Sequence, residues 1–147
     1  MKIYVGTDHR GYQLKQPLVK FLKDSGYPVL DDGDQRLDPD DDFPVFAKQV
    51  VTDVLASDDK DARGILLCGS GQGMCMAANR HKGIRAVLGY NREAAKLSRN
   101  DDDSNILCLP ADDLENNQLK QIVDVWLNTK FEAAPRFVRR LKELDEL

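Results

Sequence analysis

The sequence predicts a single α/β domain over residues 1–147, a Rossmann-like three-layer α/β/α sandwich with a five-stranded parallel sheet and a C-terminal helical tail. Three observations predict it. Strand and helix patterns alternate along the chain, the strand segments are short apolar runs, and 147 residues suffice for one sizeable core but not for two. Such alternation is typical of a parallel sheet with right-handed crossovers and helices on both faces.

The first half of the chain contains two strands and two helices. Residues 2–6 and 27–30 are short apolar strand segments, and helix 12–25 places Leu14, Leu18 and Leu22 four residues apart. Pro17 is comfortable only in a first turn, so we expect the regular part of this helix to begin near Gln16. An acidic loop covers residues 31–42, and helix 44–57 repeats its apolar residues on one face.

The second half continues the same alternation. The remaining strands are predicted at residues 64–68, 84–88 and 105–109, and the helices that follow them at residues 72–79, 92–100 and 114–127. The run before Cys68 is apolar without alternation, as expected of a strand covered on both faces. A last helix over residues 135–147 comes after the five β-α units are complete, so its packing lies outside the sheet pattern.

Composition excludes several classes of function. The formal net charge is -4, which gives no general attraction to nucleic acid. No apolar run approaches the roughly 20 residues that span a bilayer, and the chain starts with a strand without a signal-peptide pattern, so we expect no membrane partner and a cytoplasmic location. The three cysteines are odd in number and lack Cys-x-x-Cys spacing, so we expect reduced thiols and neither disulfides nor a zinc site.

The segment 64–74 is the strongest candidate for a functional loop, because a buried-strand pattern leads directly into Cys68 and then into Gly69, Gly71 and Gly73. Cys68 is therefore predicted at the carboxyl end of a strand, where open α/β sheets bind ligands. Glycines there let backbone N–H groups approach an anion closely. The alternative is that Cys68 is a small buried hydrophobe and the glycines only form a turn.

Two further pairs of residues are candidates for binding a ligand. Asp8 and His9 follow the first strand, although Asp8 is equally expected to cap the next helix and His9 to be an ordinary loop residue. Arg136 and Arg140 lie one helical turn apart in the tail, as a phosphate clamp requires, although an arginine run is more often a solvated helix face. The acidic loop 31–42 lacks the spacing of a calcium loop, so we expect a solvated loop without a functional metal.

These motifs occur together, and in this order, in the type B ribose-5-phosphate isomerases, which the whole chain resembles. The matching segments are Asp8-His9-x-Gly11, Asp42-Phe43-Pro44, residues 65–74, Ala77-Ala78-Asn79-Arg80, Gly83-Ile84-Arg85-Ala86 and Asn105-Ile106-Leu107. The same superfamily includes galactose-6-phosphate and allose-6-phosphate isomerases. The resemblance implies a Rossmann-like fold, a homodimer with shared active sites (a tetramer being the alternative), and isomerisation of a sugar phosphate without metal or cofactor.

The resemblance also implies roles for individual residues. Cys68 corresponds to the base that removes a sugar proton, and a thiolate is favoured in a loop rich in backbone N–H groups. Ser70 and the amides of Gly69, Gly71, Gln72 and Gly73 would stabilise the resulting enediolate. The counterparts of Asp8 and His9 contact the substrate. Those of Arg136 and Arg140 bind its phosphate, with the tail 131–147 of one subunit packing on the other.

Several positions depart from the family pattern and put the substrate in doubt. Where the family carries a His-Asn pair, of which the His opens the sugar ring, this chain has Asp101 and Asp102. An arginine of the family aligns with Asp112, and two further polar side chains are replaced by Phe43 and Phe137. We expect Asp101 to serve as acid or base if burial or Asp102 raises its pKa. The added negative charge should change which sugar phosphate fits.

Two functions from different classes follow. The first is an isomerase acting through Cys68 on ribose 5-phosphate, or on a hexose or nonstandard sugar phosphate. The second is a noncatalytic sugar-phosphate-binding subunit of a heteromeric isomerase. Retention of both Cys68 and Ser70 favours the first.

Overall fold

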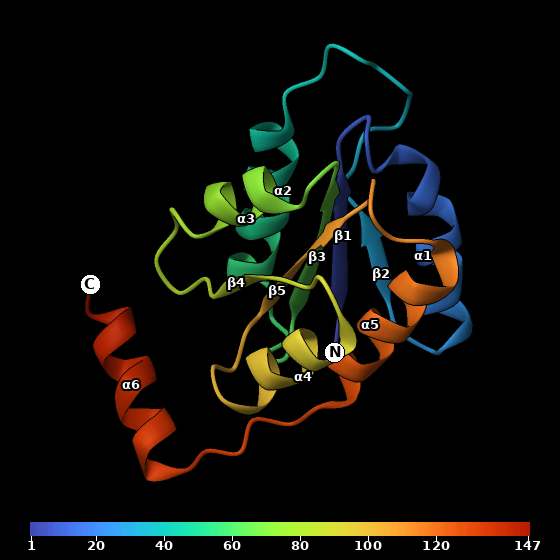
Figure 1. The fold of residues 1–147 in the computed structure, drawn as a ribbon. Coiled ribbons are helices and arrows are strands. Elements are labelled where there is room, and N and C mark those ends of the chain that lie inside the picture. The colour runs from blue at the N-terminus through green and yellow to red at the C-terminus, as the bar shows by residue number, and fades with distance from the viewer.

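Five short apolar segments form one parallel sheet in the computed structural model, which describes all residues from 1 to 147 (Figure 1). The strand order is β2-β1-β3-β5-β4, and every neighbouring pair is parallel, as predicted. The strands are β1 (Ile3–Thr7), β2 (Val29–Asp31), β3 (Arg63–Cys68), β4 (Ala86–Leu88) and β5 (Ile106–Pro110). After β1 the chain forms the edge strand β2, and it then returns past β1 to form β3 on the opposite side of β1.

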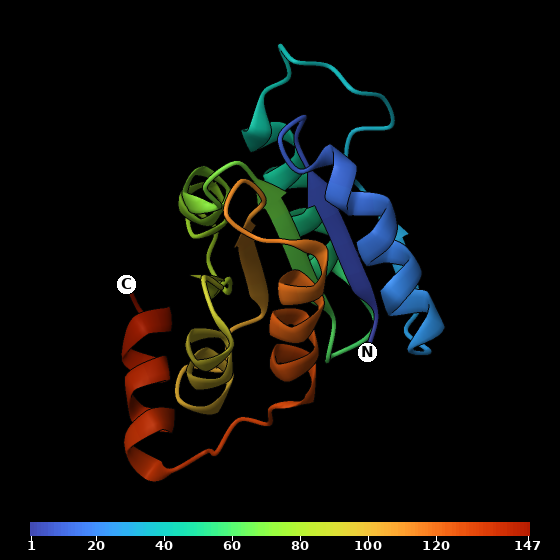
Figure 2. The same ribbon diagram turned by 45° about the vertical axis from the view of Figure 1, so that its right-hand side comes forward.

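Six helices accompany the sheet: α1 (Tyr12–Asp24), α2 (Phe43–Ala56), α3 (Gln72–Ala78), α4 (Arg92–Asn100), α5 (Asn116–Asn128) and α6 (Pro135–Asp145). In Figures 1 and 2, α2 and α3 cover one face of the sheet, while α1, α4 and α5 cover the other. The three-layer arrangement is thus confirmed. None of these helices combines the length and apolar character needed to cross a membrane.

Alternation along β3 divides the core between the two faces of the sheet. Ile65 and Leu67 are fully buried against the layer of α1, α4 and α5, whereas Leu66 and Cys68 pack with the residues of α2 and α3. Successive side chains of a strand point to opposite faces, so a strand that is apolar throughout must be covered on both sides. Each buried leucine or isoleucine contributes about 1.5–3 kcal/mol of burial free energy. This central strand therefore holds the carboxyl end of the sheet in a fixed place.

Some element boundaries differ from the predictions for local reasons. Helix α1 begins at Tyr12 and includes Pro17 in its interior, so the expected start near Gln16 is wrong. Packing of the apolar face of α1 outweighs the single backbone hydrogen bond that a proline cannot donate. Strand β4 begins only at Ala86, because the side chain of Asn105 accepts from the Arg85 N–H and that of Asn79 from the Ala86 N–H.

The tail helix α6 lies beside the body of the protein, beyond α4 and β4, and an extended segment connects it to α5 (Figures 1 and 2). Asp145, at the end of the helix, forms an ion pair with Arg85 at 3.3 Å. Phe137 is the one buried residue of α6, and both Arg136 and Arg140 are exposed. The helix therefore presents its arginines on its outside, with few internal contacts to restrain them.

Candidate functional site

The carboxyl ends of β1 and β3 bring together the two predicted site segments. Thr7, the last residue of β1, pairs with Leu67, and the Asp8 N–H donates to the Leu67 carbonyl at 3.3 Å, so the loop after β1 begins beside the last residue of β3, Cys68. The chain leaves β1 and β3 in opposite directions across the sheet, which makes their boundary the topological switch point. Parallel sheets bind ligands in the crevice outside such a point. Asp8 and Cys68 are neighbours there, as the sequence predicted.

Cys68 is the last residue of β3 and is 5 % exposed. Its side chain belongs to the apolar cluster on the α2 and α3 side, together with Leu66, Met74 and Cys108. Its packing therefore matches the alternative view of a small buried hydrophobe. Its place at the carboxyl end of a central strand is the feature that the catalytic interpretation requires.

The glycines after Cys68 form a tight turn into α3. Gly71 is the residue before the helix and has a φ of 73°, in the left-handed region that favours glycine. A Cβ atom at Gly71 would also lie 2.6 Å from Cδ1 of Leu88. Within the turn, Ser70 is exposed, and its hydroxyl accepts a hydrogen bond from the Gln72 N–H at 3.3 Å. The turn thus keeps a hydroxyl group and backbone amides next to the cysteine strand.

Asp8 is a buried carboxyl group held by backbone donors. It is 5 % exposed, and its Oδ1 accepts from the N–H groups of Arg10 at 2.9 Å and Gly11 at 3.1 Å. Burial raises the pKa of Asp8, while these two hydrogen bonds oppose the rise. Asp8 does not cap α1, because the residue before that helix is Gly11 and no side chain caps it. The carboxyl group of Asp8 is therefore fixed at the edge of the sheet, outside the helix.

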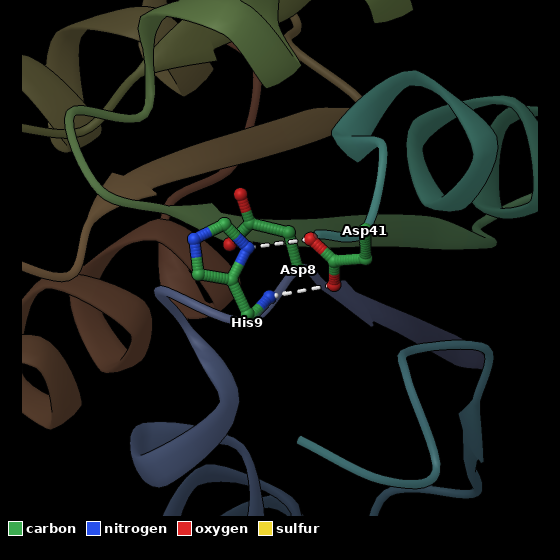
Figure 3. A group of neighbouring side chains, drawn as sticks. All are labelled: Asp8, His9 and Asp41. Atoms are coloured by element: carbon green, nitrogen blue, oxygen red, sulfur yellow. Dashed lines mark hydrogen bonds and ion pairs between the residues drawn. The ribbon is translucent and has the colours of Figure 1, made fainter. Parts of the chain in front are cut away.

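His9 is held at two points by Asp41, from the acidic loop between β2 and α2. The Asp41 Oδ1 lies 2.5 Å from the ring nitrogen Nδ1 of His9, and its Oδ2 accepts from the His9 backbone N–H at 2.8 Å (Figure 3). The hydrogen bond to Asp41 raises the pKa of His9 most, with further contributions from the charges of Asp41 and Asp8. The expectation that the acidic loop is merely solvated is therefore wrong for Asp41, whose side chain is 7 % exposed.

Asp8, His9 and Asp41 are also the residue types that bind divalent metals. The atoms that could serve as ligands all lie within 4.8 Å of one another. The hydrogen bonds of the cluster already account for its arrangement. The His9 nitrogen nearest the carboxylates faces Asp41, and Asp8 is satisfied in part by backbone donors.

Arg10 and Asp112 form an ion pair across the glycine turn. The Arg10 guanidinium contacts both carboxylate oxygens, with Nε 3.3 Å from Oδ1. A Cβ atom at Gly69 would lie 2.8 Å from Asp112 Oδ2, which shows how closely the pair covers the turn. The Asp112 N–H also donates to the Gly69 carbonyl at 3.0 Å. A cation from the β1-α1 loop and an anion from the β5-α5 loop thus meet at the mouth of the site.

The other predicted site residues lie at the opposite edge of the same sheet. Helix α4 runs back from β4 to the start of β5, so Asp101 and Asp102 precede β5 at the amino ends of the strands. Burial raises the pKa of Asp102, Asp101 adds to this rise, and Arg140 of α6 opposes it. One chain therefore brings Asp8, His9 and Cys68 together at one edge, and Asp102 and Arg140 together at the other.

A groove of about 710 Å³ lies between α6 and the edge strand β4. Basic residues line much of it, namely Arg80, His81, Lys82 and Arg85, and Asp102 and the end of α6 complete the wall. The groove includes Asp102 and therefore lies on the side of the amino ends of the strands, away from Cys68.

Sequence reasoning missed two contacts of the site, the bond between Asp41 and His9 and the ion pair between Arg10 and Asp112. Both join residues far apart in the chain. The only available signal for Asp41 was the density of carboxylates in its loop, and that signal does not distinguish one aspartate from the next.

Comparison with known proteins gives consistent results. The family profile described as Ribose/Galactose Isomerase matches residues 3–144. A probable ribose-5-phosphate isomerase B of Mycoplasma genitalium is 39 % identical over 142 residues, which cover 97 % of this chain and 92 % of that protein.

Solved structures agree closely with the fold. A ribose 5-phosphate isomerase from Thermotoga maritima superimposes with a TM-score of 0.93 at 38 % identity, over 99 % of this chain and 98 % of the other. The ribose-5-phosphate isomerase B of Mycoplasma genitalium, solved with bound ribulose-5-phosphate, gives a TM-score of 0.94 at 37 % identity, over 99 % and 94 % of the two chains.

Proposed function

The chain belongs to the Ribose/Galactose Isomerase family, and on this basis we propose that it interconverts the aldose and ketose forms of a sugar phosphate through Cys68. The observation that carries the proposal is the position of Cys68, at the carboxyl end of β3 and beside the start of the loop that follows β1 at Asp8. The ribulose-5-phosphate bound to a relative makes ribose 5-phosphate the first substrate to test.

The proposed reaction needs one base and one anion-binding surface. The Cys68 thiolate removes the hydrogen on C2 of the open-chain aldose, and the electron pair moves onto the C1 carbonyl to form an enediolate. The thiol then returns the proton to C1, and a proton shifts from O2 to O1, so the ketose forms without net gain or loss of electrons. In this proposal, Ser70 and the backbone amides of residues 69–73, in the turn directly after Cys68, stabilise the enediolate.

Asp8 and His9 are proposed to bind the substrate next to this base. The buried Asp8 carboxylate offers hydrogen-bond acceptors for sugar hydroxyls, and His9 offers a donor for an anionic oxygen. Both follow β1, which neighbours β3, so a substrate bound there reaches Cys68 directly.

We further propose a homodimer in which each active site is shared. Asp101 and Asp102 precede β5 at the amino ends of the strands, and Arg140 lies near Asp102, so a second subunit would have to bring these residues to the Cys68 of its partner. The exposed arginines of α6 and the few contacts of that helix with its own chain support this arrangement. The arginines would then bind the phosphate of the substrate held by the partner.

The carboxylates of Asp101 and Asp102 affect which sugar phosphate the protein would accept as its substrate. At the position of a ring-opening histidine, Asp101 would have to transfer the proton itself, and an added negative charge disfavours a phosphorylated ligand. A substrate with a different ring, such as a hexose phosphate, is the proposed alternative. A noncatalytic binding subunit is the second candidate function, and the substitution at Asp101 is the observation that favours it.

One assay tests the proposal and separates these candidates. The protein is incubated with a panel of pentose and hexose phosphates, and conversion of aldose to ketose is followed. Cys68→Ala should lower turnover of the preferred sugar by about a thousandfold, the usual contribution of a positioned base, and leave ligand affinity by calorimetry almost unchanged. Cys75→Ala, a half-buried thiol of α3, is the matched control. Turnover that survives in Cys68→Ala refutes the role of base, and binding without turnover by the wild type identifies a binding subunit.

A further inference from the structure

The contact between Asp41 and His9 joins two segments that are otherwise separate. His9 belongs to the loop after β1, and Asp41 is the second-last residue before α2, at the end of the acidic loop. Each carboxylate oxygen of Asp41 has one partner in His9: Oδ1 meets the ring Nδ1 at 2.5 Å, and Oδ2 meets the backbone N–H at 2.8 Å. Two bonds from one rigid carboxylate fix the ring and the backbone of the same residue.

The contact is important for Asp41 because its carboxylate is buried. The side chain of Asp41 is 7 % exposed, whereas that of His9 is 28 % exposed, so the carboxylate is shielded and the ring keeps one side open. A shielded carboxylate needs donors, and His9 supplies both of those described for it. Since Nδ1 faces Asp41, the other ring nitrogen, Nε2, points away from the carboxylate (Figure 3).

We propose that Asp41 is a positioning residue, which holds the His9 ring with Nδ1–H toward its own carboxylate and presents Nε2–H of a positively charged imidazole to an anionic group of the substrate. The proposal rests on the proposed function for the identity of that anion, a sugar phosphate. Asp41 itself does not touch the substrate, and it acts through His9. An acidic residue placed behind a histidine in this way fixes both the orientation and the protonation of the ring.

The charged groups around His9 favour this protonated state. The hydrogen bond to Asp41 raises the pKa of His9, the charges of Asp41 and Asp8 add to the rise, and Arg10 and partial desolvation oppose it. His9 therefore keeps its charge to a higher pH than a free histidine. Without Asp41, it would lose that charge at lower pH, and its ring would be free to turn.

The test is Asp41→Asn, which keeps the size of the side chain and removes its charge. The His9 titration, followed by NMR of the ring nitrogens, should move to lower pH. KM for the sugar phosphate that the protein isomerises should rise about tenfold at pH 7.5, the value of a charge-assisted hydrogen bond, and much less at pH 5.5. Turnover at saturation should change little, because the base is elsewhere.

Two controls keep the result clear. Asp40→Asn removes the same charge from an exposed neighbour and should leave the His9 titration and KM unchanged. The chain has only two histidines, so His81→Gln identifies the His9 signals directly. Equal effects of Asp40→Asn and Asp41→Asn, or an unmoved His9 titration in Asp41→Asn, overturn the proposal.

The NMR measurement also separates this proposal from the proposed function. If the wild type isomerises no sugar phosphate, the His9 titration in Asp41→Asn still decides the role of Asp41. If Asp41→Asn does not fold, the wild type alone decides it: Nδ1 of His9 must carry a proton at pH 7.5, and an Nε2-only tautomer would contradict the proposal.

Discussion

The negative charge of Asp112, next to the candidate site, is compensated by a single residue, Arg10. Asp112 places a carboxylate beside the glycine turn, which by itself disfavours an anionic substrate. The guanidinium of Arg10 pairs with it there, so the local charge is balanced by a residue from a different loop. Both side chains are largely exposed, so the pair contributes at most about 1 kcal/mol to stability. The pair matters more for ligand binding, because it determines the electrostatic potential that an anionic ligand meets next to Gly69.

We therefore expect Asp112→Asn to strengthen phosphate binding. Removing the carboxylate frees Arg10 to bind an anion, so the inhibition constant of inorganic phosphate should fall about threefold to tenfold at low salt. Arg10→Ala should have the opposite effect, because it leaves Asp112 unpaired. Asp113→Asn is the matched control, an exposed aspartate next in the chain. A similar gain in Asp113→Asn would mean that overall charge, and not this pair, controls binding.

At the level of single residues, candidates could be named from the sequence, but their partners became visible only in the structure. Asp8 and Cys68 could be placed from the sequence because each directly follows or ends a strand, and the ends of neighbouring parallel strands meet. Asp41 could not be placed, because nothing local distinguishes it from the exposed Asp40. Its role depends on how an irregular loop returns to the sheet.

Among the secondary-structure elements, the turn from β3 into α3 depends most on glycine. Gly71 combines a φ of 73° with crowding by Leu88 and by the backbone of β5, where the Leu109 carbonyl carbon would lie 3.0 Å from an added Cβ. Gly26, just after α1, has a φ of 89° and nothing within 4 Å of such a Cβ. The two glycines therefore differ in crowding but share a positive φ.

This pair makes a direct comparison possible. Gly26→Ala should lower the free energy of unfolding by about 1 kcal/mol, the cost of a left-handed alanine. Gly71→Ala should lower it by about 2–4 kcal/mol, because the methyl group must also displace Leu88. Urea denaturation of both variants measures the difference. Equal losses would show that the backbone conformation alone requires glycine at Gly71.

The element boundaries were predicted best where packing follows local pattern. Helix α4 and the buried strand β3 have strong periodicity or continuous apolar character, and their predicted bounds agree with the structure within a residue. Strand β4 was predicted too long, because the side chains of Asn79 and Asn105 take over the backbone hydrogen bonds of its first residues. Such side-chain contacts depend on the tertiary fold.

In the whole molecule, the candidate site residues are divided between two edges of one sheet. Cys68 lies at the carboxyl edge, and Asp102 and Arg140 lie at the amino edge. A shared site predicts complementation between two inactive variants. Cys68→Ala and the double variant Arg136→Ala/Arg140→Ala each lose activity alone. After unfolding and refolding together, half of the dimers should be mixed, with one intact site each.

The expected recovery is about a quarter of wild-type activity, measured with the preferred sugar phosphate at equal subunit concentrations. Refolding each variant by itself is the control and should recover almost nothing. If the mixture stays inactive although size-exclusion chromatography shows mixed dimers, the two groups of residues do not form one site.

The α/β class, the five parallel strands and the placement of Asp8 and Cys68 at the same edge of the sheet all followed from the amino-acid sequence alone. Each of these follows from local hydrophobic pattern and from the rule that parallel strands end at the same edge. The three-dimensional arrangement was needed to show that Asp41 restrains His9, that Arg10 neutralises Asp112, and that Asp101 and Arg140 lie away from Cys68 in their own chain. These features join residues distant in sequence, and the three-dimensional path of the loops and of α6 brings such residues together or keeps them apart.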